Sequence, residues 1–301
     1  MTDISTNLRP VSAIVDAIET LEGGGFLVHR PFPTTSLDMI DPFLLLDEMG
    51  PTEVAPGEAI GAPDHPHRGF ETVTYMLEGE VEHRDSAGNH GIIGTGDVQW
   101  MTAGAGVVHS EMPGTRLQRE GGRSHGLQLW VNLPRAAKMT PPRYQDLRAA
   151  DIPTVERDGV SLKVIAGTAL GVVGPANTHV PILYVHARID EGATLDLEVP
   201  SDEHAFAYVL SGSGEFGRDA RVAGRAQLVR FGPGAPGAAG GAADGVRIRG
   251  GVGGLEVVVL AGRPLREPVV RYGPFVMNTK AEIVTAFDDY RSGRMGQITP
   301  S

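Results

Sequence analysis

The 301-residue chain contains no cysteine. Disulfide bonds, thiolate metal sites and cysteine nucleophiles are therefore excluded. Lysine is also scarce: it occurs only at Lys138, Lys163 and Lys280, so arginine supplies most of the positive charge. The formal net charge is -11 and the sequence holds no Lys/Arg cluster, so we expect no direct binding to nucleic acid.

Long apolar runs are missing as well. No run approaches the roughly 18 apolar residues of a membrane-spanning helix. The N-terminus carries Asp3, Asp16, Glu19 and Glu22, where a signal peptide would have a basic region and then an apolar one. The composition, 41% hydrophobic and 21% charged, allows a sizeable core. We therefore expect a soluble, cytoplasmic protein of one large domain or two ordinary ones.

Turn-forming residues, by contrast, are abundant, with 41 glycines and 22 prolines. Short β-like runs recur between them and predict an all-β sandwich or barrel. In the first half the runs cover residues 25–29, 71–77, 79–84, 91–93, 97–101 and 126–131. In the second half they cover residues 162–166, 182–189, 194–199, 205–210, 226–231 and 255–261.

Other segments divide the chain. Residues 138–143 are rich in proline and basic residues, which predicts a linker between the two β-rich series. The glycine-rich segment 232–254 lacks the G-K-[S/T] ending of a phosphate loop, so we interpret it as a long turn or loose loop. The sequence T-K-A-E at 279–282 has the form of a capping box and predicts a helix through about residue 290.

Two residue pairs carry the chemistry: His65 with His67, and His109 with Glu111. Residues two apart on a β-strand point to the same face. Two such strands side by side would aim three imidazoles and one carboxylate at one point, which is a ligand set for a divalent transition metal. Fe(II) suits this set and its two open positions, but Ni, Co, Mn, Cu and Zn also bind imidazole.

The two halves resemble distant repeats, because Y-M-L-E-G in the first matches Y-V-L-S-G in the second. This alignment places Glu198 and Pro200 opposite His65 and His67, and no histidine follows His204. We infer a duplicated barrel in which only the first copy keeps a metal.

Several longer motifs resemble the pirin family of bicupins. They are HPHRGFETVTY at 65–75, GDVQWMTAG at 96–104, HSEMP at 109–113, DPFLLLDE at 41–48 and PFVMNT at 274–279. The resemblance covers nearly the whole chain and is dense in the first half. It implies two antiparallel β-barrel (cupin) domains packed together, with a short C-terminal helix. We place the metal-binding N-terminal cupin in residues 1–137 and a degenerate, metal-free C-terminal cupin in residues 138–301.

The resemblance also implies a function. The family's metal ligands map onto His65, His67, His109 and Glu111, and the metal is usually iron. Several members have quercetin 2,3-dioxygenase activity, so our leading hypothesis is a dioxygenase that uses O2 on quercetin-like flavonols, with Glu111 accepting the substrate proton. Other members act as regulatory partners of proteins, and a metal- or redox-gated protein that binds an enzyme or a transcription factor is the alternative. A lyase or isomerase that uses the metal to hold an enediolate is also compatible with the ligands.

Residues around the motifs have weaker assignments. Glu71 shares a face with His67, and we interpret it as a supporting acid in preference to a ligand. Gln128 and Trp130 share one face of a later strand, and His125 lies on the other, so Gln128 is the better candidate for the pocket. We interpret His83, like the remaining histidines, as a surface or satisfied polar group. Phe70, Met76 and Trp100 are predicted core residues.

Overall fold

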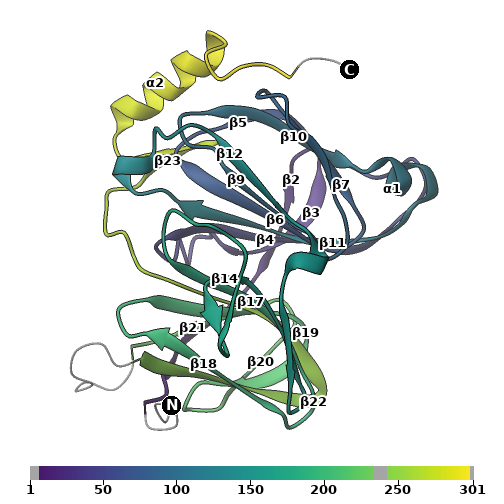
Figure 1. Ribbon diagram of the computed structural model, residues 1–301, viewed down its shortest axis with the longest axis vertical. Helices are drawn as coiled ribbons and strands as arrows, with labels where there is room; N and C mark the ends of the chain where they lie inside the picture. Colours follow the sequence, from purple (N-terminus) through teal and green to yellow (C-terminus); the bar gives the residue numbers. More distant parts are fainter. Residues whose placement is uncertain (1–6, 234–242, 299–301) are drawn as a thin grey trace. The chain divides into compact units, whose positions relative to one another are not determined.

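The computed structural model describes residues 7–233 and 243–298 (Figure 1). It divides into two compact units, each built mainly of antiparallel strands. We name residues 18–149 and 265–298 the histidine unit, and the described residues of 1–17 and 150–264 the aliphatic unit. The expected all-β class is confirmed, although the strands form the sheets of a β-sandwich and not closed barrels.

The histidine unit contains a seven-stranded sheet and a four-stranded sheet. The order of the larger sheet is β12-β9-β6-β11-β4-β3-β2, and that of the smaller sheet is β5-β10-β7-β8. The larger sheet comprises β2 (Ile18–Glu22), β3 (Phe26–Phe32), β4 (Phe43–Val54), β6 (Phe70–Glu78), β9 (Val98–Thr102), β11 (Gly122–Asn132) and β12 (Arg143–Leu147). The smaller sheet comprises β5 (Ala62–His67), β7 (Val81–Asp85), β8 (His90–Ile93) and β10 (Val107–Pro113).

The turn between β5 and β6 depends on glycine. Gly69 has a φ of 89°, and a Cβ atom at this position would overlap the carbonyl oxygen of Val276. The ammonium group of Lys138 donates to the carbonyl oxygens of Gly69 and Val276 and to the side-chain oxygen of Asn132, at 2.8, 2.9 and 2.8 Å. These contacts hold the end of β5 against a distant part of the chain.

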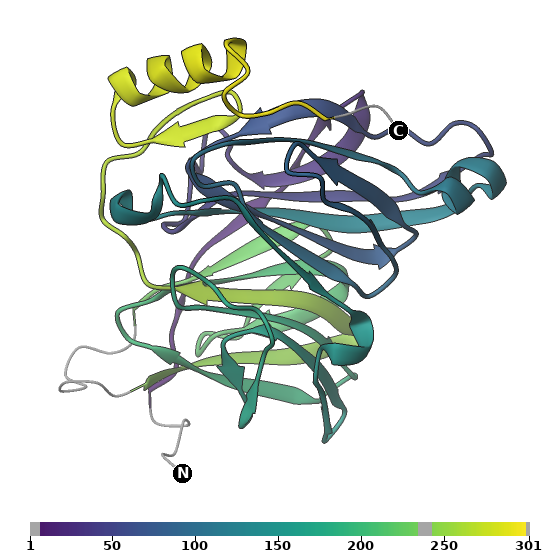
Figure 2. The ribbon, with the colours of Figure 1, turned by 45° about the horizontal axis from the view of Figure 1, so that its top comes forward.

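That distant part is the C-terminal segment, which belongs to the histidine unit. It contains the hairpin of β23 (Val270–Tyr272) with β24 (Phe275–Met277), followed by α2 (Lys280–Arg291), and α2 lies beside the hairpin (Figure 2). Arg68 forms a 2.7 Å ion pair with Asp289 on α2. The predicted helix and its capping box are confirmed, because Thr279 and Glu282 each bond the backbone N–H of the other.

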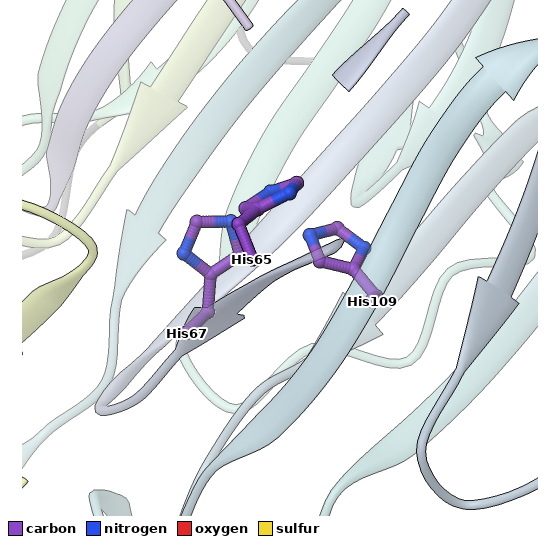
Figure 3. Close-up of side chains that lie close together, drawn as sticks. All are labelled: His65, His67 and His109. Carbon is purple, nitrogen blue, oxygen red and sulfur yellow. The ribbon is translucent and has the colours of Figure 1, made fainter. Parts of the chain in front are cut away.

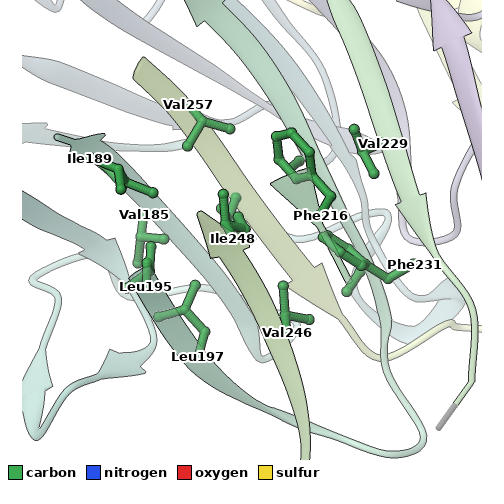
Figure 4. Close-up of a cluster of buried hydrophobic side chains, with 14 of the residues drawn as sticks. Val185, Ile189, Leu195, Leu197, Phe216, Val229, Phe231, Val246, Ile248 and Val257 are labelled. Carbon is green, nitrogen blue, oxygen red and sulfur yellow. The ribbon is translucent and has the colours of Figure 1, made fainter. Parts of the chain in front are cut away.

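The aliphatic unit has one nine-stranded sheet, with the path β1-β21-β19-β22-β17-β14-β13 and with β18 and β20 paired to β22 and β19. Leu195 and Leu197 alternate with more exposed residues along β18, and Val246 and Ile248 do so along β22, so the aliphatic side chains gather in one interior (Figure 4). The strands are β1 (Val11–Asp16), β13 (Thr154–Arg157), β14 (Val160–Ala166), β17 (Ile182–Ile189), β18 (Thr194–Pro200), β19 (His204–Phe216), β20 (Arg221–Gly224), β21 (Gln227–Phe231) and β22 (Ala243–Gly262). A separate small hairpin joins β15 (Thr168–Ala169) and β16 (Val172–Val173).

The two units are not divided at residue 137 as expected. The N-terminal segment belongs to the aliphatic unit, and the C-terminal segment belongs to the histidine unit. The N-terminal strand β1 pairs with β21 of the aliphatic unit, whereas residues 265–298 join the histidine unit. Any edge strand offers the same backbone N–H and C=O groups, so sequence periodicity does not encode which sheet a terminal segment joins.

Two expectations for the segments between strands were wrong. Residues 138–143 are not an exposed linker, since Lys138 is buried and β12 begins at Arg143. The glycine-rich segment is also not a continuous loop, because β22 begins at residue 243; residues 234–242 of that segment lie outside the described residues. A short helix, α1 (Thr115–Glu120), was not anticipated. No helix in the described chain is long and apolar enough to cross a membrane.

Candidate metal centre

Three histidines converge in the smaller sheet of the histidine unit (Figure 3). β5 and β10 are antiparallel neighbours, with His65 opposite His109 and His67 opposite Val107. One ring nitrogen from each of His65, His67 and His109 lies within 4.8 Å of the others, and the ring centroids are 4.3–4.9 Å apart. Among residues 7–233 and 243–298, this is the one group of three or more such ligand atoms. The structure thus brings these three side chains together as the strand spacing predicted, and their role as metal ligands stays a prediction.

Hydrogen bonds on the far side of each ring orient the imidazoles. The Nδ1 atom of His65 lies 2.7 Å from the carbonyl oxygen of Pro63, and the Nδ1 atom of His67 lies 3.3 Å from that of Pro274. Because a carbonyl only accepts, each Nδ1 carries a proton, and whenever the ring is neutral it is Nε2 that has the lone pair. Bonds of this kind are how proteins fix the tautomer of a metal-binding histidine.

The third histidine is oriented by another histidine. The Nδ1 atom of His109 lies 3.1 Å from the Nε2 atom of His83, and both side chains are buried. The Nε2 atom of His109 is buried and has no hydrogen-bond partner among the described residues. Such an orphaned atom facing two other imidazoles is what a bound metal ion would satisfy, so the donor set fits a metal.

Burial also favours the neutral form of two of the rings. It lowers the pKa values of His67 and His109 well below the usual histidine range, and the neighbouring imidazoles lower them further. A neutral imidazole is the form that ligates a metal, so these two residues do not have to lose a proton at neutral pH before binding.

Glu111 stands apart from the three histidines. It is not in the histidine group, and its Oε1 and Oε2 atoms lie 2.6 Å from the Thr74 hydroxyl and 3.2 Å from the Gln128 amide nitrogen. The register between β10 and β5 shifts between His109 and Glu111, because three residues of β5 span the distance covered by two of β10. The extra residue lies on β5 between Ala62 and His65, whereas β10 keeps its regular pairing with β7, so His109 and Glu111 still share one face of β10.

Thr74, Gln128 and Glu111 form a closed ring of contacts. The Thr74 hydroxyl also lies 2.7 Å from the Gln128 side-chain oxygen, so it faces two oxygen atoms with a single proton to donate. A carboxyl proton on Glu111, donated to Thr74, would complete all three hydrogen bonds. The ring thus places both carboxylate oxygens of Glu111 within hydrogen-bond distance of the Thr74 and Gln128 side chains.

A cavity of about 530 Å³ opens beside the histidines, and we name it the histidine cavity. Its wall includes His65, His67, Glu111, Gln128 and Trp130, together with a polar cluster. In that cluster Arg30 binds both carboxylate oxygens of Asp47, at 2.7 and 2.5 Å, and also contacts Glu22 at 2.5 Å. Burial raises the pKa of Asp47 to about 6, which leaves its carboxylate ionised at neutral pH.

Comparison with known proteins agrees with this geometry. The sequence profile of the pirin family matches residues 25–131, and that of the pirin C-terminal cupin domain matches residues 184–296. The chain belongs to the pirin family. A pirin-like protein of Solanum lycopersicum is 43% identical over 298 residues, covering 98% of this chain and 96% of the relative. Pirin of Rattus norvegicus is 42% identical over 299 residues, covering 96% and 94%.

A solved structure extends the likeness from sequence to fold. The crystal structure of a quercetin 2,3-dioxygenase from Acinetobacter baumannii is 37% identical, covers 97% of this chain and 100% of its own, and has a TM-score of 0.88. Both units are therefore cupin domains, as the resemblance implied. This likeness and the histidine cluster together point to a single divalent metal in the histidine unit of this pirin-family chain.

The remaining expectations for this pirin-family site had mixed outcomes. Gln128 and Trp130 both line the histidine cavity, whereas His125 instead bonds Glu48 at 2.8 Å. Glu71 lies on β6, accepts a 2.7 Å hydrogen bond from Thr102 and is outside the histidine group.

Of the two alternatives expected for His83, a surface or a satisfied polar group, the second is confirmed: His83 is buried on the neighbouring strand β7 and hydrogen-bonded to His109. Its contact with a candidate metal ligand was not anticipated. The sequence indicates only that His83 lies in a strand of the first β-rich series. That position does not predict which residue of a neighbouring strand His83 contacts.

Proposed function

We propose that this chain is a metal-dependent dioxygenase that cleaves quercetin-like flavonols, with iron as the expected metal. The observation that carries the proposal is the convergence of three oriented imidazoles beside a cavity of about 530 Å³. That volume lies within the range of drug-sized ligand pockets, about 300–1,000 Å³. The 37% identity to a quercetin 2,3-dioxygenase across nearly the whole chain supports the choice of substrate class.

His65, His67 and His109 would hold the ion through their Nε2 atoms, and Glu111 would be the fourth ligand or lie beside it. When bound, the metal supplies a Lewis acid and a template for the 3-hydroxyl and neighbouring carbonyl oxygens of the flavonol. The aromatic face of Trp130 and the amide of Gln128 line the same cavity, where a flat polyphenol would need both an apolar surface and a polar one.

Glu111 would move the proton that the reaction displaces. The flavonol 3-hydroxyl must lose its proton, and Glu111 is a carboxylate of the cavity wall close to the histidines. Thr74 and Gln128 would supply hydrogen-bond partners for the protonated carboxyl. In the overall reaction both atoms of O2 enter the product and the two ring carbon–carbon bonds at C3 of the flavonol break. C3 then leaves with its own oxygen as carbon monoxide. Glu111 then returns its proton to the carboxylate of the product.

The test is an aerobic assay of the full chain with quercetin, after loading with Fe, Ni, Co, Mn or Cu in turn. We expect loss of the flavonol absorbance band together with release of carbon monoxide for at least one metal. The double variant His65→Ala/His109→Ala is the matched control and should be inactive with every metal. Absence of turnover with all five metals in the unaltered chain would contradict the dioxygenase proposal.

A further inference from the structure

The histidine unit contains a second cavity, of about 370 Å³, which we name the apolar cavity. Its wall is mainly aliphatic, with one aromatic ring, that of Phe26, and side chains from β3, β4, β6, β7 and α1. Polar and acidic residues, among them Glu58 and Glu80, complete the lining. Examples of the apolar side chains are Leu27, Val54, Met76, Val81 and Leu117, none of which lines the histidine cavity. None of the contacts described for the metal centre involves these five side chains.

The two cavities share one wall. Phe26, Met49, Ala62 and Glu111 line both of them. A methionine in such a wall has three rotatable side-chain bonds and adapts its shape readily. The apolar cavity therefore adjoins the histidine cavity along a boundary to which these four residues contribute.

The hydrogen bonds of Glu111 also connect the two cavities. One carboxylate oxygen lies 2.6 Å from the hydroxyl of Thr74, which lines the apolar cavity and not the histidine cavity. The other lies 3.2 Å from the amide of Gln128, which lines the histidine cavity and not the apolar one. A rotation of the Glu111 side chain toward the histidines would remove it from this position between the cavities.

We propose that the apolar cavity is the route by which dioxygen reaches the metal centre, with the Glu111 side chain at its inner end. The inference rests on the proposed dioxygenase function, in which a flavonol and O2 must occupy the site together. Ligand cavities bury most of the surface of a drug-sized ligand, so a flavonol in the histidine cavity blocks its mouth to a second reactant. Dioxygen is small and apolar, and apolar cavities in proteins admit apolar guests such as xenon.

The test combines a structural probe with a kinetic one. Crystals of the full chain pressurised with xenon should show xenon in the apolar cavity. The variant Val81→Phe adds bulk to the wall of the apolar cavity and not to that of the histidine cavity. The matched control is Ile92→Phe, because Ile92 lies on the paired strand β8 and is 46% exposed. With the flavonol already bound, nitric oxide, a diatomic probe, should associate with the iron-loaded Val81→Phe protein several-fold more slowly than with the Ile92→Phe protein.

The outcomes separate this route from the proposed function. Xenon in the cavity and slowed nitric oxide association in Val81→Phe support the route even if no flavonol is turned over, in which case only the dioxygenase proposal fails. Absence of xenon from the cavity, or equal association rates in the two variants, overturns the route even if flavonol is turned over. Weaker flavonol binding in Val81→Phe with an unchanged association rate also overturns it, because the cavity then holds part of the organic substrate.

Discussion

The Nε2 atom of His83 lies 3.1 Å from the Nδ1 atom of His109, and the two rings are stacked at a tilt with their centroids 5.2 Å apart. For His109 to offer Nε2 to a metal, its Nδ1 must carry the proton and donate it to His83. His83 thus acts as a positioning residue that selects the tautomer of His109. The two carbonyl partners of His65 and His67 have the same effect on their rings.

Replacing His83 should weaken metal binding without removing a ligand. We expect His83→Leu to lower metal affinity by about 10- to 100-fold, because the buried N–H of His109 loses its acceptor. His83→Gln, which keeps an acceptor, should recover part of that loss. His90→Leu, an exposed histidine on the adjoining strand, is the control and should leave affinity unchanged. Competition titration with a chelator and the absorption spectrum of the Co(II)-loaded protein measure the effect. Equal affinities for His83→Leu and His90→Leu would contradict a positioning role.

One metal ion should bind per chain. The histidine cluster lies in the histidine unit, whereas the interior of the aliphatic unit is filled by side chains such as Val185, Leu197 and Val246 (Figure 4). His65→Ala/His109→Ala should abolish binding, and His204→Ala should leave the stoichiometry unchanged. Elemental analysis of the purified variants checks this. Two metal ions per chain would show that the second cupin has kept a site.

Metal binding should persist to lower pH than free histidine would allow. Free imidazole titrates near about pH 6.5, and protons compete with the metal below that point. Because burial lowers the pKa values of His67 and His109, their neutral forms persist further into acid and metal loss should occur below that value. Metal content after dialysis over a pH series is the measurement. Loss centred near about pH 6.5 would contradict the effect of burial, and full retention at about pH 4 would argue against a histidine-dominated site.

Glu111→Gln should separate binding from chemistry. The amide keeps the size and an oxygen atom but loses the charge and the ability to accept a proton. We expect measurable metal binding with turnover reduced at least about tenfold, a modest loss for a general base. Turnover measured at saturating metal decides the role. Full recovery there would leave Glu111 as a ligand only.

Lys138 should make the free energy of unfolding depend on pH in the alkaline range. Burial lowers its pKa to about 8, so between about pH 8 and the lysine value of 10.5 the unfolded chain binds more protons than the folded one. Stability contributed by Lys138 should therefore rise with pH across this window, by up to about 3 kcal/mol. The difference in unfolding free energy between the unaltered chain and Lys138→Met, measured in urea at several pH values, isolates the effect. A difference that stays constant with pH would contradict it.

The sequence was sufficient for the histidine cluster because a two-residue period is a strict property of strands. His65, His67 and His109 follow that period, and pairing of β5 with β10 brings them together. The role of Glu111 as a fourth ligand stays a prediction: the two-residue rule holds along β10, whose pairing with β7 is regular from His109 to Glu111, but the Glu111 carboxylate contacts Thr74 and Gln128 and is outside the histidine group. The role of His83 was missed because its importance comes from a contact across strands, and a lone histidine has no spacing to reveal it.

The arrangement of the termini was beyond prediction on similar grounds. The capping box at Thr279 correctly predicted α2, because capping is a local interaction. Which sheet the flanking segments joined depended on backbone pairing that any sequence can make, and on buried contacts such as Lys138 with Val276. The composition of residues 138–143 indicated a linker only because proline and basic residues are more often exposed than buried.

The bond from His67 to the carbonyl of Pro274 spans 207 positions of the chain. Pro274 is translated more than two hundred residues after His67, so a nascent chain that has not reached Pro274 has one candidate metal ligand without its orienting acceptor. We expect such a chain to bind the metal more weakly than one that includes Pro274.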